Sequence, residues 1–226
     1  MDVIQFIQPW YMLSFAFRWL GEKKTHAYTL PMLRGYRQDK KDDKELCRKL
    51  WELMNEADIL CGHNADAFDQ KMAYARFVKH GFTPPAPSQT IDTLKIARKH
   101  FKFPSNKLDD LGQYLGVGKK LAHHGFDTWI GCMERDDPKS WNEMLLYNKR
   151  DVELLERVYL KLKSFSSNHP NRNVYMGTLD HCPTCGSNKV IKNGWRFTRA
   201  GKTQRYSCNN CGAWSNAPKS ALAIVR

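Results

Sequence analysis

The chain has 226 residues, of which 42% are hydrophobic and 12% aromatic, and a formal net charge of +13. This size and composition allow one mid-sized core and a small module held together by a metal. No apolar run reaches the ~18 residues that span a bilayer, and the N-terminus lacks the basic segment and apolar core of a secretory signal. We therefore expect neither a membrane protein nor a secreted one.

The N-terminal region predicts a hairpin followed by a helix. A dense apolar and aromatic run, Trp10–Trp19, precedes the turn Gly21–Lys24 and a second short run, His26–Leu30. Apolar residues at helical spacing then follow Asp42 and Asp43, whose charges suit the positive end of a helix.

Strands and helices alternate through the middle of the sequence. Residues 59–61 predict a short buried strand, and a helix follows with Phe68, Met72 and Ala75 on its buried face until Gly81 ends it. The next elements are a strand at 90–91, a helix through Arg98, a helix at 108–115 and a long helix at 138–165. This order predicts an α/β fold.

Two short patterns in this region carry chemistry. Asn64, Phe68 and Asp69 run from a strand end into a helix, where a rigidly held carboxylate suits a metal ligand and equally a charge that complements the helix dipole. Tyr147 and Asp151 share one face of the long helix, so that the phenol can orient a metal-bound water beside a metal-anchoring carboxylate. Each pattern is common alone, but their joint occurrence in this order favours a metal site.

At these residues the chain resembles the phage-type 3′–5′ exonucleases of the DEDD superfamily, in the tyrosine branch. The family pattern Asn-x-x-x-Phe-Asp is matched by Asn64, Phe68 and Asp69, and Tyr-x-x-x-Asp is matched by Tyr147 and Asp151. The resemblance covers roughly residues 10–165 and implies an RNase H-like mixed sheet with flanking helices. It further implies a nucleic-acid substrate near Asn64 and Phe68 and Mg²⁺ or Mn²⁺ on Asp69 and Asp151. Tyr147 would orient the attacking water. The resemblance also implies that the protein acts in the cytoplasm of a bacterial or phage-infected cell.

The family's first motif, Asp-x-Glu on the opening strand, has no counterpart here. Asp2 is the only acid before Glu22, and no acid stands two positions after it. By the family layout that strand fills the middle of the sheet and supplies two of the four metal-binding carboxylates. We therefore expect a chain that lacks its first strand, has an open apolar seam and shows little activity alone.

Three interpretations of that gap stay open. The sequence starts at an internal Met, a separately encoded N-terminal fragment completes the sheet, or the domain is a degraded remnant. Residues 1–7 would fill part of the seam without supplying the chemistry.

Four cysteines near the C-terminus form the most specific pattern in the sequence. Cys182-Pro-Thr-Cys185-Gly and Cys208-Asn-Asn-Cys211-Gly are two CxxC knuckles, each followed by a Gly that accepts the positive φ of the turn. This spacing predicts a zinc ribbon, with rubredoxin-like iron and two disulfides as the alternatives. Cys47, Cys61 and Cys132 are expected to be ordinary buried or half-buried thiols.

The segment between the knuckles is basic and aromatic and contains no acid. From residue 166 onward there are nine Lys or Arg and one acid, against 27 and 22 in residues 1–165. Alternating cations and aromatic rings suit phosphate neutralisation and base stacking, while a purely solubilising ribbon or one that docks on an acidic protein is the alternative. The expected contacts are Lys192, Trp195, Arg196, Phe197, Arg199, Lys202, Arg205 and Tyr206. The stretch resembles zinc ribbons at the ends of some transposase-related and phage proteins.

The sequence thus predicts an RNase H-like domain over 1–165, a polar linker over 166–180, a zinc ribbon over 181–216 and a tail over 217–226. We expect a metal-dependent 3′–5′ exonuclease with structural zinc that acts on nucleic acid, above all single-stranded DNA. Replication proteins or a separate N-terminal fragment are the expected protein partners. A catalytically dead nucleic-acid-binding protein is the main alternative, and a transposition-related protein is suggested by the ribbon alone.

Overall fold

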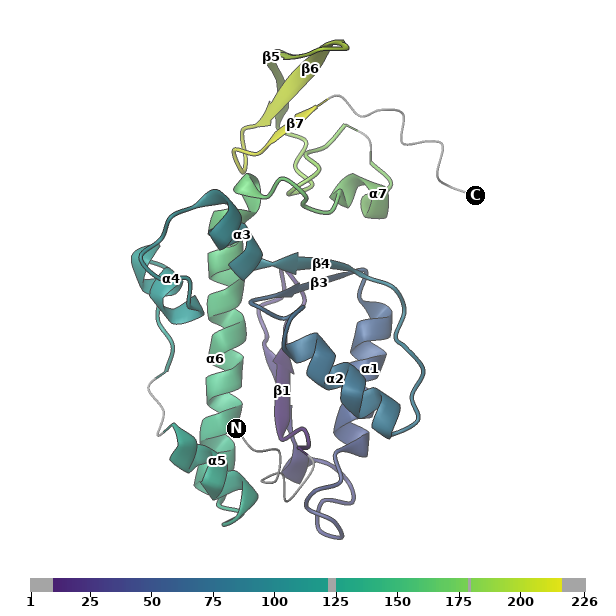
Figure 1. Cartoon of the computed structure of the whole chain (residues 1–226), viewed down its shortest axis with the longest axis vertical. Coiled ribbons are helices and arrows are strands. Elements are labelled where there is room, and N and C mark those ends of the chain that lie inside the picture. The colour runs from purple at the N-terminus through teal and green to yellow at the C-terminus, as the bar shows by residue number, and fades with distance from the viewer. Residues whose placement is uncertain (1–9, 122–124, 179, 217–226) are drawn as a thin grey trace.

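The computed structural model describes residues 10–121, 125–178 and 180–216. An α/β part surrounds one long helix, and a small β part stands beyond the C-terminal end of that helix (Figure 1). The α/β part consists of β1 (Ser14–Phe17), β2 (His26–Thr29), η2 (Leu30–Met32), α1 (Lys44–Glu56), β3 (Ile59–Gly62), α2 (Asp69–Lys79), β4 (Gln89–Asp92), α3 (Thr93–His100), α4 (Leu108–Tyr114), α5 (Phe126–Met133), α6 (Pro138–Leu162) and η3 (Lys163–Phe165). Then follow α7 (Arg172–Met176), β5 (Val190–Thr198), β6 (Gly201–Cys208) and β7 (Trp214–Asn216).

The predicted hairpin, both short strands and the helices before and after them are confirmed, but β3 is largely half-buried instead of buried. β1 pairs with β2 in antiparallel register, and β3 pairs with β4 in parallel register. The long helix α6 begins at Pro138 behind Asp137, whose carboxylate accepts the N–H groups of Lys139 and Ser140. α5 was not predicted, because the amphipathic pattern of its eight residues is too weak to indicate a helix from sequence.

The strands of the α/β part do not form one mixed sheet among the described residues. β1–β2 and β3–β4 are separate two-stranded ladders. An apolar cavity of about 460 Å³ lies between them, lined by Phe17 of β1, Leu60 and Cys61 of β3, and Leu155 of α6. The expected single sheet is therefore not observed, and its interruption falls between β1 and β3. Residues 1–7, which we expected to fill part of this seam, lie outside the described residues.

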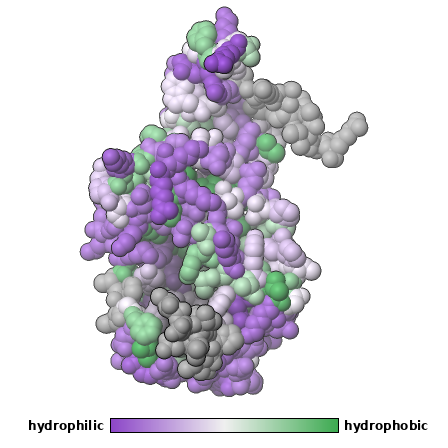
Figure 2. Space-filling model, viewed as in Figure 1, coloured by the Kyte–Doolittle hydropathy of each residue, from purple (hydrophilic) through white to green (hydrophobic). Residues whose placement is uncertain are grey.

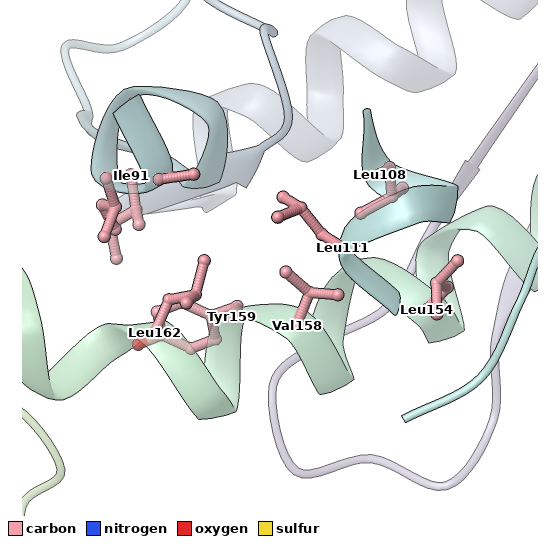
Figure 3. Packing of buried hydrophobic residues seen from close by; sticks show 9 residues of the cluster. Ile91, Leu108, Leu111, Leu154, Val158, Tyr159 and Leu162 are labelled. Carbon is pink, nitrogen blue, oxygen red and sulfur yellow. The ribbon is translucent and has the colours of Figure 1, made fainter. Parts of the chain in front are cut away.

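Helix α6 supplies the core of the α/β part. Leu154, Val158, Tyr159 and Leu162 pack against α3 and α4 in one buried cluster, which Figure 3 shows from close by. Trp141, nearer the start of α6, belongs to a second cluster with residues of the hairpin region and α5. The buried residues of this helix thus form one face along most of its length. None of the helices in the described ranges has the length and apolar character needed to cross a bilayer.

Two predictions about burial are wrong. The buried face of α2 contains Ala73, Arg76 and Phe77, whereas Phe68 is 57% exposed and Ala75 is exposed too. Cys61 is an exposed thiol, because it borders the open cavity between the two ladders, while Cys47 and Cys132 are buried as expected.

A buried charge pair explains why α2 buries a different face from the one predicted. Asp43, fully buried just before α1, accepts hydrogen bonds from Arg76 Nε at 2.8 Å and from the backbone N–H of Met12 at 2.6 Å. His80 Nε2 lies 2.6 Å from Asp43 Oδ1, and Arg76 Nη1 donates to the carbonyl of Trp10 at 3.0 Å. Burial alone would raise the pKa of Asp43, but these hydrogen bonds outweigh it and lower the pKa. Pairing the charges draws α2 inward on its Arg76 side.

We predict that Arg76→Met destabilises the protein by about 3–5 kcal/mol at pH 7, because it leaves the Asp43 charge buried and unpaired. The lowered pKa means that the wild-type pair stabilises the fold above the ordinary pKa of Asp and loses this contribution as the pH falls through the folded value. In Arg76→Met the buried Asp43 carboxyl loses this partner, so burial raises its pKa and it takes up a proton as the pH falls. The deficit of the variant should therefore shrink from pH 7 toward pH 4, as measured by urea unfolding at both pH values.

The matched control is the double variant Arg76→Met with Asp43→Asn, which removes both charges. It should be less destabilised than the sum of the single variants. A deficit below about 1 kcal/mol for Arg76→Met at pH 7 would show that the pair does not hold this region together.

Candidate active site and cysteine cluster

A cavity of about 350 Å³ opens where the chain entering β1 meets α2, α5 and α6. Asp69, the first residue of α2, and Tyr147 of α6 both line it. Phe68 and Trp129 add aromatic rings that are 57% and 49% exposed. The structure thus brings together residues from the two sequence motifs, which are almost eighty positions apart.

The loop before α2 is fixed by Asp92 at the end of β4. Asp92 Oδ1 accepts the backbone N–H groups of Asn64 and Leu94, both at 2.9 Å. Asn64 has a φ of 65°, one of the two positive values outside glycine in the described chain, and its carbonyl accepts the N–H of Phe68. The backbone of Asn64 therefore sets the path of the loop from β3 to Phe68 and Asp69 at the start of α2.

Asp69 is an exposed residue, yet the groups around its carboxyl disfavour the negative charge. Desolvation, and then the charge of Asp92, raise the pKa of the Asp69 carboxyl. A carboxylate in this position gains from a nearby cation, as a metal ligand does.

Tyr147 and Asp151, one turn apart on α6, both bond Lys120. Lys120 Nζ donates to Asp151 Oδ2 at 2.6 Å and to the Tyr147 hydroxyl at 2.9 Å, and it lies 5.0 Å from the centre of the phenol ring. The other carboxylate oxygen, Asp151 Oδ1, is buried and has no hydrogen-bond partner within the described part of the chain.

Such an orphaned oxygen fits a divalent cation, because a buried carboxylate oxygen normally has a partner. The fit is incomplete: among the described residues, no group of three ligating side chains gathers around Asp69 or Asp151. Asp69 is joined to the other pair through the cavity that it shares with Tyr147.

Sequence reasoning missed Lys120 and Asp92. The contacts of Lys120 with Tyr147 and Asp151 bridge 27 and 31 residues, so no local pattern announces them. Asp92 had a usable signal, since it directly follows a predicted strand and caps α3 by accepting the N–H groups of Leu94 and Lys95.

The four C-terminal cysteines form one cluster, as the spacing predicts. Their sulfur atoms all lie within 4.8 Å of one another, and the Cys182–Cys211 and Cys185–Cys208 pairs are 3.7 Å apart. Tetrahedral zinc with Zn–S bonds of about 2.3 Å requires a similar separation, whereas a disulfide requires about 2.05 Å. Gly186 and Gly212 each have a φ of 74°, which confirms the predicted turn geometry.

The strands next to this cluster display cations and aromatic rings on both faces. Because cross-strand partners share a face, Trp195 and Phe197 stand with Lys202, and Lys202 Nζ lies 4.9 Å from the Trp195 ring centre. On the opposite face Arg205 lies 5.2 Å from the ring of Trp214.

Exposure is highest on the β5 strand of this surface. Phe197 is 77% exposed and Trp195 is 45% exposed, whereas Tyr206 is half-buried. The basic residues of the predicted contact surface are exposed: Lys192, Arg196, Arg199, Lys202 and Arg205. Hydrophilic groups cover most of the face seen in Figure 2, including the end of this hairpin, with apolar groups in small patches.

The segment expected to be a linker contains α7 and is attached at both ends. Tyr159 Oη lies 2.8 Å from His169 Nε2, and Ser164 Oγ donates to the carbonyl of Cys211. The N–H of Arg172 donates to the carbonyl of Pro183 at 2.8 Å. These bonds connect the end of α6 with the cysteine cluster.

Two sequence comparisons with known proteins find a superfamily that this chain matches and a relative that it resembles in part. A segment of 85 residues, 37% of this chain, is 31% identical to Protein NEN3 of Arabidopsis thaliana. That segment covers 16% of NEN3, so the chain spans only about a sixth of this relative. Residues 13–163, more than half of the chain, match the RNase_H superfamily. The chain therefore belongs to the RNase H superfamily.

Proposed function

We propose that this protein is a metal-dependent 3′–5′ exonuclease of the DEDD type, tyrosine branch, that acts on nucleic acid. The observation that carries the proposal is the pairing of Tyr147 with Asp151, whose second oxygen is buried without a described partner. Membership of the RNase H superfamily implies a nucleic-acid substrate in general. The finer assignment rests on the two motifs and on the cavity shared by Asp69 and Tyr147.

Each side chain has a distinct part in this mechanism. Asp69 and Asp151 would hold Mg²⁺ or Mn²⁺, which when bound lowers the pKa of water and neutralises charge on the phosphate. Tyr147 is placed to orient the attacking water through its hydroxyl, one turn from Asp151. The exposed ring of Phe68 lines the cavity, and Asn64 lies in the loop that leads to Phe68; both would contact the terminal nucleotide.

A second candidate is a nucleic-acid-binding protein without catalysis. One observation favours it: the described strands β1 and β3 are not joined in one sheet. Two carboxylates alone fix cations beside a phosphate poorly. An Asp-x-Glu strand would supply the missing ligands.

The C-terminal module serves either function. We propose that Cys182, Cys185, Cys208 and Cys211 bind structural zinc, and that the adjoining hairpin binds single-stranded nucleic acid. The sulfur separations and the cation–aromatic pairs support this assignment. The hydrogen bond from Ser164 to the Cys211 carbonyl would hold the module at the end of α6.

The zinc assignment predicts about one zinc per chain by elemental analysis of the purified protein. Cys185→Ser should release the metal and unfold the ribbon, because structural zinc supplies the folding free energy of such modules. Cys61→Ser, a change of an exposed thiol elsewhere, is the control and should leave the zinc content unchanged. Zinc-free protein with two disulfides by mass spectrometry would refute the site.

The binding assignment predicts two separable effects on single-stranded DNA affinity. Trp195→Ala should weaken binding by about 1–3 kcal/mol through lost stacking and keep the salt slope. Arg199→Ala should lower the salt slope by about one phosphate contact.

Fluorescence anisotropy over a salt series measures both quantities. Deletion of residues 181–226 should lower the affinity and the slope together. An unchanged slope after this deletion would assign the hairpin another role.

The catalytic proposal predicts negligible Mg²⁺- or Mn²⁺-dependent exonuclease activity for the 226-residue chain alone. Fusion of an N-terminal strand that bears Asp-x-Glu should restore activity. In the restored protein Asp151→Asn should abolish cleavage, and Tyr147→Phe should lower the rate by ~10²-fold.

Release of mononucleotides from a 3′-labelled single strand is the measurement. Robust cleavage by the 226-residue chain that persists in Asp69→Asn would place the active site elsewhere. Binding without cleavage in the fused protein would favour the second candidate.

A further inference from the structure

Lys120 bonds both Tyr147 and Asp151, and it belongs to neither motif. Its ammonium is 2.6 Å from Asp151 Oδ2 and 2.9 Å from the Tyr147 hydroxyl. Both partners lie on the same face of α6, so one cation spans one turn of the helix.

The loop that carries Lys120 is positioned by tight packing. The backbone N–H of Lys120 donates to Asp109 Oδ1 of α4 at 2.6 Å, and Arg157 Nη1 of α6 reaches the carbonyl of Val117 at 3.4 Å. A Cβ on Gly112 would come within 2.7 Å of the Gly118 carbonyl, so glycine there permits the loop to approach α4. The ammonium is therefore delivered by the fold of the loop as well as by attraction to Asp151.

The contact has a directional consequence for the phenol. An ammonium only donates hydrogen bonds, so the Tyr147 oxygen accepts from Lys120 and its O–H hydrogen must point in another direction. Lys120 thus fixes Tyr147 as a donor toward groups other than itself.

The contact also divides the carboxylate of Asp151. Lys120 holds Oδ2, whereas Oδ1 is buried without a described partner. A divalent cation would gain Oδ1 but would meet the repulsion of the ammonium at the same carboxylate. The lysine therefore weakens the affinity of the site for metal while it orders both side chains.

We propose that Lys120 is a positioning residue of the site, which orients the Tyr147 hydroxyl and, by sharing Asp151, limits the affinity for a divalent cation. This inference rests on the proposed function, since it assumes that Asp151 is a metal ligand. It assigns to Lys120 a role separate from substrate binding by the C-terminal hairpin.

The test is a titration of the zinc-loaded full chain with Mn²⁺, followed by electron paramagnetic resonance of the free ion. Lys120→Met keeps the length of the side chain and removes its charge, and it should tighten Mn²⁺ binding by ~10-fold. Lys120→Arg keeps the charge and should stay within about twofold of the wild type.

Lys119→Met is the matched control, because it removes the same charge from the adjacent and exposed residue. It should not change the affinity for Mn²⁺. Equal affinities for Lys120→Met and Lys119→Met would overturn the proposal, as would undetectable Mn²⁺ binding in both. Thermal unfolding of each variant identifies a loss of structure, and weaker Mn²⁺ binding by a folded Lys120→Met would overturn the proposal as well.

Activity of the fused Asp-x-Glu protein separates this inference from the proposed function. There Lys120→Met should lower kcat by ~10-fold or more with little change in KM, since the phenol loses its orientation, and Lys120→Arg should recover part of the rate. Tighter Mn²⁺ binding without any nuclease activity would sustain the role of Lys120 at Asp151 and count against the exonuclease. Nuclease activity with unaltered Mn²⁺ affinity in Lys120→Met would do the reverse.

Discussion

The buried carboxylate of Asp43 constrains the whole N-terminal half of the α/β part. It joins the start of α1 to Arg76 and His80 of the α2 region and to the chain that enters β1 through Met12. Loss of any partner would leave the buried charge unpaired at a high cost in free energy, so the three segments are coupled to one another. The same segments form one wall of the cavity that contains Asp69. The site therefore inherits its geometry from a charge pair that takes no part in its chemistry.

Helix α6 supplies the opposite wall and links it to the C-terminal module. Its buried residues hold α3 and α4, and its less buried face carries Tyr147 and Asp151. Because a rigid helix fixes the distance between successive turns, the site and the end of α6 cannot be displaced separately. The bond from Ser164 to the Cys211 carbonyl then ties the cysteine cluster to this helix (Figure 1). A strand of nucleic acid held by the hairpin would thus meet the cavity from a fixed direction.

The local features of the fold were predictable from the sequence, and the long-range contacts were not. Hydrophobic periodicity and glycine positions gave the hairpin, the two short strands and the course of α6, and the CxxC knuckles gave the cysteine cluster. The buried face of α2 was misassigned, because a pattern of apolar residues cannot foresee that Arg76 is drawn inward by a carboxylate 33 residues away. Lys120 was missed for the same reason, because its contacts with Tyr147 and Asp151 depend on a loop that folds back over α6. The position of a buried charged residue depends on its partner, and the fold decides which partner lies nearby.

The separation of β1–β2 from β3–β4 explains why binding and catalysis must be tested apart. Strand edges without a neighbour and an apolar cavity between them are costly in water, so a strand that enters this space would gain hydrogen bonds and buried surface together. Cys61 and Phe17 at the cavity and Asp69 and Tyr147 at the adjoining site share Leu50 as a common wall residue. A strand that fills the first space would therefore contact Leu50, which also lines the second. If the fold is the proposed exonuclease, its activity depends on the state of this seam as well as on the individual carboxylates.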